Sequence, residues 1–148
     1  MGWVVKFWSL PAREKKLLCE ASILLLLCAT GVKAIAFRHI DKFLRLRWND
    51  RIQRGIDDEQ RIKLVQRSIS RAANVLPWRS LCLSRSIAEF IMLRRRGISA
   101  VMFAGVRFSD NSALDAHAWV DTGQVNNDRS SEDPDFATVI RIGTGVDR

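Results

Sequence analysis

Three residues in this sequence have types suited to nucleophilic catalysis through sulfur: Cys82, His117 and Asp128. A cysteine thiolate attacks a carbonyl carbon, an imidazole accepts the thiol proton and passes it to the leaving group, and a carboxylate orients the imidazole. These are the nucleophile, the base and the orienting acid of a cysteine hydrolase or acyl transferase. Both reactions pass through a thioester, so the residue types alone do not separate them.

Cys82 precedes a predicted amphipathic helix over residues 83–96, in which Leu83, Ile87 and Phe90 recur at helical spacing. Arginines in the last turn and Gly97 after it indicate where that helix ends. The unpaired N–H groups and the dipole at a helix N-terminus favour an anion, and therefore the reactive thiolate. The backbone amide of Cys82 is also a candidate oxyanion donor. A single free cysteine is more often a small buried apolar residue, which is the alternative reading.

His117 lies in a predicted strand over residues 114–121. Strand alternation places His117, Trp119 and Asp121 on one face and Ala118 on the other. An imidazole on a strand can accept the proton of a thiol that the fold brings to it. The alternatives are a histidine satisfied by a backbone carbonyl and, for Trp119, a place either in the core or in the wall of the active site.

Asp128 is selected by hairpin register. If residues 122–123 form a two-residue loop, Asp121 pairs with Gln124 and His117 lies directly opposite Asp128. Directly opposed residues have Cβ atoms about 5 Å apart, whereas Asp121 lies about 13 Å from His117 along the same strand. The register therefore favours Asp128 as the orienting acid. A loop one residue longer would turn Asp128 to the other face.

The elements that position these residues are predicted to be helices first and strands afterwards, which is an α+β order. Helices are expected over residues 11–30, with Ser9 as cap and Gly31 as the end, and then over 33–48 and 83–96. Between the last two, Asp57 or Asp58 is expected to cap a helix that Pro77 ends and that carries an apolar stripe of Ile62, Val65, Ile69 and Ala72/Ala73. Strands are expected over residues 99–108, 114–121, 124–128 and 136–142. We expect a basic helical region at 1–58 and a catalytic domain at 59–148.

The charge of the chain is unevenly divided. The 148 residues carry a formal net charge of +8; residues 1–80 hold 16 Lys+Arg against 7 Asp+Glu, while residues 81–148 hold 8 against 9. Every candidate catalytic residue lies in the neutral half. The basic half is therefore the expected docking surface, with Lys15, Lys16, Arg45 and Arg47 as candidates. The absence of known nucleic-acid motifs argues against nucleic acid as the partner.

An apolar run at residues 21–32 raises the question of a membrane span. A spanning helix needs roughly 20 apolar residues, and the run is bounded by Glu20 and Lys33. No convincing signal-peptide cleavage pattern follows it. We expect a helix buried against other elements. Membrane-surface contact through the basic half stays open as an alternative.

No cofactor or metal ion is predicted. The sequence has no glycine-rich phosphate loop, and His39 has no second ligand nearby at metal spacing. Cys19 and Cys28 are nine residues apart on one predicted helix, about 13.5 Å, so they cannot bridge each other there. The three cysteines are also too few for a disulfide scaffold.

Several short motifs resemble those of the lasso-peptide maturation proteases, which are members of the transglutaminase-like superfamily. The similarity covers roughly residues 76–128 and lies in residues 77–86 (PWRSLCLSRS), 93–98 (LRRRGI), 105–107 (GVR) and 116–120 (AHAWV). The motifs follow the family's order. Cys82 matches the nucleophile and His117 the base. Asp128 corresponds to the family's acid, which lies in a variable strand, and Asp121 stands where the family more often has glutamate.

This resemblance implies a transglutaminase-like or papain-like core and a cysteine protease that removes the leader from a ribosomally made precursor peptide. It also implies a bacterial cytoplasmic setting, a separate leader-recognition protein and a partner cyclase that closes the lasso ring. Two alternatives stay open: a transglutaminase-like acyl transferase, and a non-catalytic basic adaptor at a membrane or nucleic acid.

Overall fold

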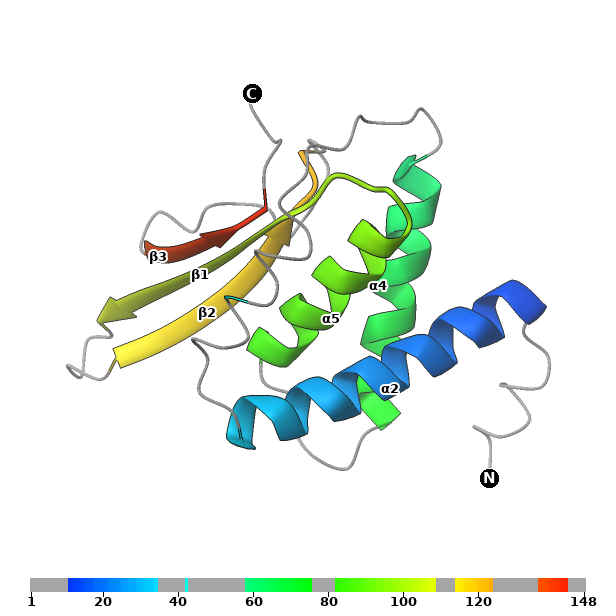
Figure 1. The fold of residues 1–148 in the computed structure, drawn as a ribbon, viewed down its shortest axis with the longest axis horizontal. Helices are drawn as coiled ribbons and strands as arrows, with labels where there is room; N and C mark the ends of the chain where they lie inside the picture. The colour runs from blue at the N-terminus through cyan, green and yellow to red at the C-terminus, as the bar shows by residue number, and fades with distance from the viewer. Residues whose placement is uncertain are drawn as a thin grey trace.

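The computed structural model describes residues 11–34, 42, 58–75, 82–108, 114–123 and 136–143, and in these ranges three long helices lie beside a three-stranded antiparallel sheet (Figure 1). The helices are α2 (Ala12–Ala34), α4 (Asp58–Val75) and α5 (Cys82–Arg95). The strands are β1 (Val101–Phe108), β2 (Leu114–Asp121) and β3 (Ala137–Ile142). The predicted α+β class and the helices-first order are confirmed.

Helix α5 is the central element of the fold. It contacts the sheet on one side and both α2 and α4 on the other (Figure 1). A single buried cluster joins these elements, with members from α2, α4, α5 and the sheet such as Leu25, Val65, Phe90 and Met102. Helix α2 thus shares one core with the later elements, while the predicted division at residue 58 stays a prediction.

Helix α4 carries the predicted apolar stripe. Ile62, Val65, Ile69 and Ala72 are all buried, at the i, i+3, i+7 and i+10 spacing of one helix face. This part of the prediction is confirmed. Pro77, expected to end the segment, lies outside the described residues.

The predicted end of the first helix at Gly31 is wrong. Helix α2 continues to Ala34, so Lys33, expected to open a second helix, belongs to the first. Glycine ends a helix by adopting a positive φ, and Gly31 is helical instead. Inside a helix a glycine costs only about 1 kcal/mol. Ser9 and nearly all of the expected helix at 33–48 lie outside the described residues. Among the residues described, no helix has the length and apolar character needed to cross a bilayer.

The predicted end of the next amphipathic helix is confirmed at Gly97. The amide of Gly97 donates to the carbonyl of Arg94 (3.1 Å) and the amide of Ile98 to that of Leu93 (3.1 Å), the hydrogen-bond pair of a Schellman motif. Gly97 has φ +72°, the left-handed conformation that this motif requires. The chain then turns from α5 directly into β1.

We expect Gly97→Ala to lower the free energy of unfolding by about 1 kcal/mol, because L residues with a Cβ are strained at positive φ. The added methyl group itself meets nothing within 4 Å, so the cost is conformational rather than steric. Urea denaturation followed by circular dichroism measures it. Gly31→Ala is the matched control; it should be neutral or stabilising because Gly31 is helical with open space around it.

The sheet has the order β2-β1-β3, with both pairs antiparallel. In the β1–β2 register Phe103 pairs with Trp119 and Gly105 with His117. The β1–β3 register shifts between Ala104 and Gly105. Strands predicted at 99–108, 114–121 and 136–142 are confirmed with small changes at their ends, while the strand expected at 124–128 lies outside the described residues.

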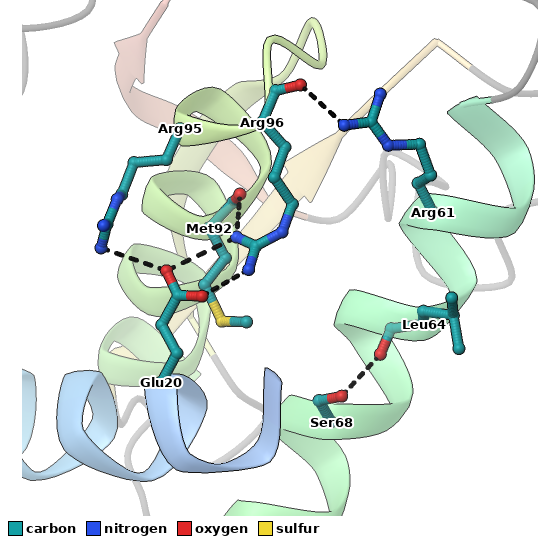
Figure 2. Close-up of polar contacts among 7 residues, drawn as sticks. All are labelled: Glu20, Arg61, Leu64, Ser68, Met92, Arg95 and Arg96. Atoms are coloured by element: carbon teal, nitrogen blue, oxygen red, sulfur yellow. Dashed lines mark hydrogen bonds and ion pairs between the residues drawn. The ribbon is translucent and has the colours of Figure 1, made fainter. Parts of the chain in front are cut away.

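A charged cluster ties the end of α5 to the two other helices (Figure 2). Glu20 of α2 forms ion pairs with Arg95 (3.1 Å) and with Arg96, which also donates to the carbonyl of Met92 (2.7 Å). Arg61 of α4 donates to the carbonyl of Arg96 (3.2 Å). Because the Glu20 side chain is only 22% exposed, this cluster fixes α2 and α4 against the C-terminal end of α5.

Candidate active site

Cys82 is the first residue of α5, and its side chain is half-buried. Its Sγ lies 3.7 Å from the carbonyl oxygen of Ala116, to which the thiol can donate a hydrogen bond. Ala116 directly precedes His117 on β2. The structure therefore brings the candidate nucleophile beside the strand that carries the candidate base.

A second contact holds α5 along β2. The hydroxyl of Ser86 donates to the carbonyl of Ala118 at 2.8 Å, and both residues are buried. Cys82 and Ser86 are one helical turn apart, about 6 Å, and their acceptors Ala116 and Ala118 are two strand residues apart, about 6.7 Å. The matched spacings align the first turn of α5 with β2. Ser86 is thus a supporting residue that the sequence analysis did not identify.

His117 is exposed on β2, and its ring packs against two other aromatic rings. The ring of Trp119 is stacked on it, with centroids 5.9 Å apart and planes 15° apart, and the ring of Phe136 is tilted against it at 5.6 Å and 47°. Ala118 and Val120 are buried. The stacking places His117 and Trp119 on one face of β2, as predicted, whereas burial along the strand does not alternate, since residues 118 to 120 are all buried. Trp119, only 7% exposed, is both buried and in contact with His117.

The two other carboxylates on β2, those of Asp121 and Asp115, have contacts of their own. The Asp121 Oδ1 accepts a hydrogen bond from the amide of Gly123 at 2.7 Å, which closes the turn after β2. Asp115 forms an exposed ion pair with Arg107 at 3.2 Å. Asp128 lies outside the described residues, so its pairing opposite His117 stays a prediction.

Sequence reasoning missed the row of side chains that surrounds His117. Phe103 stacks on Trp119 at 5.6 Å, and Arg141 lies over Phe103 at 5.9 Å. At the other end Arg107 lies over Phe136 at 4.5 Å. The alternation of Phe103, Gly105 and Arg107 along β1 was a usable signal. To place these side chains beside His117, the alternation has to be combined with the register of β1 against β2, and pairing between distant segments sets that register.

The two cysteines on α2 are free thiols, as expected from their spacing. Cys19 is exposed, whereas Cys28 is half-buried and its burial raises the pKa of the thiol to about 11. In the ranges that the structure covers, no group of three or more His, Cys, Asp or Glu residues is arranged to hold a metal ion.

We expect Cys28 to resist alkylation at pH 8.5 while Cys19 reacts. With a pKa of about 11, only about 0.3% of the Cys28 thiol is ionised at that pH, and the thiolate is the reactive form. The unfolded thiol ionises at lower pH than the folded one. The contribution of Cys28 to the free energy of unfolding therefore falls as pH rises from about 9 towards 11. Iodoacetamide labelling read by peptide mass spectrometry tests the difference, and labelling in denaturant is the control. Equal labelling of both cysteines in the folded protein would contradict it.

The profile of the transglutaminase-like superfamily matches residues 24–141, a stretch that runs from α2 into β3 and includes all three candidate catalytic residues. The chain belongs to the transglutaminase-like superfamily. It has no significant match among curated proteins or among solved structures. Members of the transglutaminase-like superfamily usually use a cysteine for catalysis, as proteases or as acyl transferases. The helix N-terminus that carries Cys82 and the strand that carries His117 both lie within the matched stretch.

Proposed function

We propose that this transglutaminase-like protein is a cysteine protease that removes the leader peptide from a ribosomally synthesised lasso-peptide precursor. One observation supports it most: the thiol of Cys82, at the N-terminus of α5, lies 3.7 Å from the carbonyl of the residue before His117. The motifs of residues 77–86 and 116–120 add the resemblance to leader-cleaving members of the superfamily.

In this proposal Cys82 acts from the first turn of α5, at the positive end of the helix dipole. The thiol proton passes to His117, and Sγ attacks the carbonyl carbon of the scissile peptide bond. The C–N bond breaks when His117 returns the proton to the leaving amine. Water then hydrolyses the thioester and regenerates the thiol. Asp128 orients the imidazole, and the Cys82 amide donates to the oxyanion.

The test is cleavage of a leader-bearing precursor in the presence of the leader-recognition protein, followed by mass spectrometry. Cys82→Ala should abolish cleavage. Cys19→Ala is the matched control, since Cys19 is an exposed cysteine on α2, and it should cleave at the wild-type rate. Cleavage that survives in Cys82→Ala refutes the enzymatic proposal. A primary amine added to the reaction separates protease from acyl transferase, because an acyl transferase converts it to an amide product.

The proposal includes three partners: the precursor, a separate leader-recognition protein and the cyclase that acts next. Helix α2 offers a surface for one of them, since Ile23 and Leu27 are 57% and 62% exposed and Lys16 is exposed on the same helix. Positions 16, 23 and 27 lie seven and four residues apart, so they share one face of α2. A basic and apolar surface suits an acidic leader, a partner protein or an anionic membrane.

Charge reversal of Lys15, Lys16, Arg45 and Arg47 to glutamate is expected to raise the KM for the precursor about tenfold, because surface charge steers an acidic partner. The reaction of Cys82 with iodoacetamide should keep its wild-type rate. Arg45 and Arg47 lie outside the described residues, so Lys16→Glu alone is the variant that tests the α2 surface. If the charge reversal slowed the iodoacetamide reaction of Cys82 as well as raising the KM, the docking surface and the catalytic residues would not act separately.

A further inference from the structure

We propose that Trp119 and Phe136 are positioning residues that hold the imidazole of His117 in the orientation needed for proton transfer. The inference rests on the proposed function, in which His117 is the base. It gives a role in that reaction to two residues, Trp119 and Phe136, that the sequence analysis did not assign to catalysis. The juxtaposition that carries it is the imidazole of His117 packed against both the Trp119 and the Phe136 rings.

An exposed histidine on a strand is free to turn about its side-chain bonds unless neighbouring groups restrict it. At position 117 the stacked Trp119 ring sets the plane of the imidazole to within 15° of its own. The tilted Phe136 ring, 5.6 Å away, also packs against it. The two contacts restrict the plane of the imidazole, and a restricted plane limits the directions in which its two nitrogens can point. A base whose nitrogen points away from the thiol accepts its proton slowly.

Gly105 makes the position of Phe136 available. It pairs with His117 across β1 and β2, at the point where the β1–β3 register shifts. A Cβ at this position would lie 3.0 Å from the carbonyl oxygen of Ala137, 3.3 Å from the Cβ of Phe136 and 3.3 Å from Cη2 of Trp119. The absence of a side chain at Gly105 therefore lets both rings approach the imidazole.

The two positioning rings are supported from outside. Phe103 stacks on Trp119 with centroids 5.6 Å apart and planes 16° apart. The guanidinium of Arg107 lies 4.5 Å from the centroid of Phe136 and also pairs with Asp115. Aromatic stacking and cation–π contacts each stabilise a fixed ring geometry. The two rings that pack against the imidazole are therefore themselves kept in place by Phe103 and Arg107.

The arrangement also suits the charged form of the base. When His117 takes the thiol proton it becomes an imidazolium, and the negative π face of the stacked Trp119 attracts a cation. The stabilisation arises only when the proton has moved, so it acts on the catalytic step and not on substrate binding. The expected signature is a change in kcat with little change in KM.

The experiment compares Trp119→Leu and Phe136→Leu with the aromatic replacements Trp119→Phe and Phe136→Tyr. The leucine variants should lower kcat for precursor cleavage about 10- to 100-fold, as misplaced catalytic groups do, with KM changed less than about threefold. The aromatic replacements should restore most of the rate. Phe108→Leu is the control, because Phe108 is a 79% exposed aromatic residue on β1; it should leave kcat unchanged.

Gly105→Ala supplies a second test in which every ring is kept. Its methyl group should displace Phe136 or Trp119 and lower kcat in the same way, with the fold checked by circular dichroism. If a leucine variant does not fold, Gly105→Ala takes its place in the kinetic comparison. Wild-type kcat in Gly105→Ala and in every folded leucine variant would overturn the inference, and so would equal losses in the leucine and the aromatic variants.

A readout independent of activity separates this inference from the proposed function. The imidazole protons of His117 should show ring-current shifts in NMR spectra that disappear in Trp119→Leu. If the wild-type protein does not cleave the precursor, the proposed function fails whatever these shifts are. If it cleaves and the His117 shifts do not change in Trp119→Leu, the positioning inference fails while the function stands.

Discussion

His117→Ala is expected to lower the rate of leader cleavage by about a thousandfold. A positioned base contributes between about 10² and 10⁴ to a rate, and loss of one member of a catalytic triad removes most of the effect of the others. The expected loss is in kcat. The reaction of Cys82 with iodoacetamide should slow as well, because the thiol loses its proton acceptor.

The sequence provides a matched control for this variant, since it has a second histidine, His39. His39→Ala should cleave the precursor at the wild-type rate. Single-turnover cleavage followed by mass spectrometry measures both variants. A His117→Ala protein within tenfold of the wild-type rate would remove His117 from the role of base, and the protein would then need another proton acceptor near Cys82.

The second large effect is expected at Asp128. Asp128→Asn should lower kcat about 100-fold or more, since an amide in place of the orienting carboxylate favours the wrong imidazole tautomer. Asp121→Asn should lose far less activity. The Asp121 Oδ1 accepts a hydrogen bond from the Gly123 amide, and the amide oxygen of asparagine can accept the same bond.

The pair of variants tests the hairpin register as well as the role of the residue. If Asp121→Asn costs more activity than Asp128→Asn, residues 122–123 do not form the two-residue loop that places Asp128 opposite His117. Equal and small losses in both variants would assign the orienting group to another residue. Steady-state kinetics at saturating precursor distinguishes these results.

Local patterns predicted the elements because each pattern arises from burial along a single segment. The stripe of Ile62, Val65 and Ile69 predicted the buried face of α4, and strand alternation predicted that His117 and Trp119 share one face of β2, where their rings stack. Gly31 misled the prediction because a glycine signals a helix end only where the backbone turns to positive φ. Sequence alone does not show whether the neighbouring residues continue the helix.

The surroundings of the site could not be predicted because they depend on contacts between distant segments. Phe136 is 19 residues from His117 in the chain, and the two rings meet across β1, with which both β2 and β3 pair. Nothing in the sequence around Phe136 indicates that pairing. The chemistry predicted Cys82 beside His117; the structure shows the Cys82 thiol beside the carbonyl of Ala116, and the matched spacing of α5 and β2 aligns the helix with the strand.

The contact of Glu20 with Arg95 and Arg96 bears on where a truncated form of the protein should begin. A fragment that starts at residue 24, where the superfamily match begins, lacks Glu20 together with the buried Leu17 and Ala21. It would expose apolar surface on α4 and α5 and leave both arginines without their carboxylate. The smallest fragment suited to expression and crystallisation therefore includes the whole of α2, although its first turns lie outside the matched stretch.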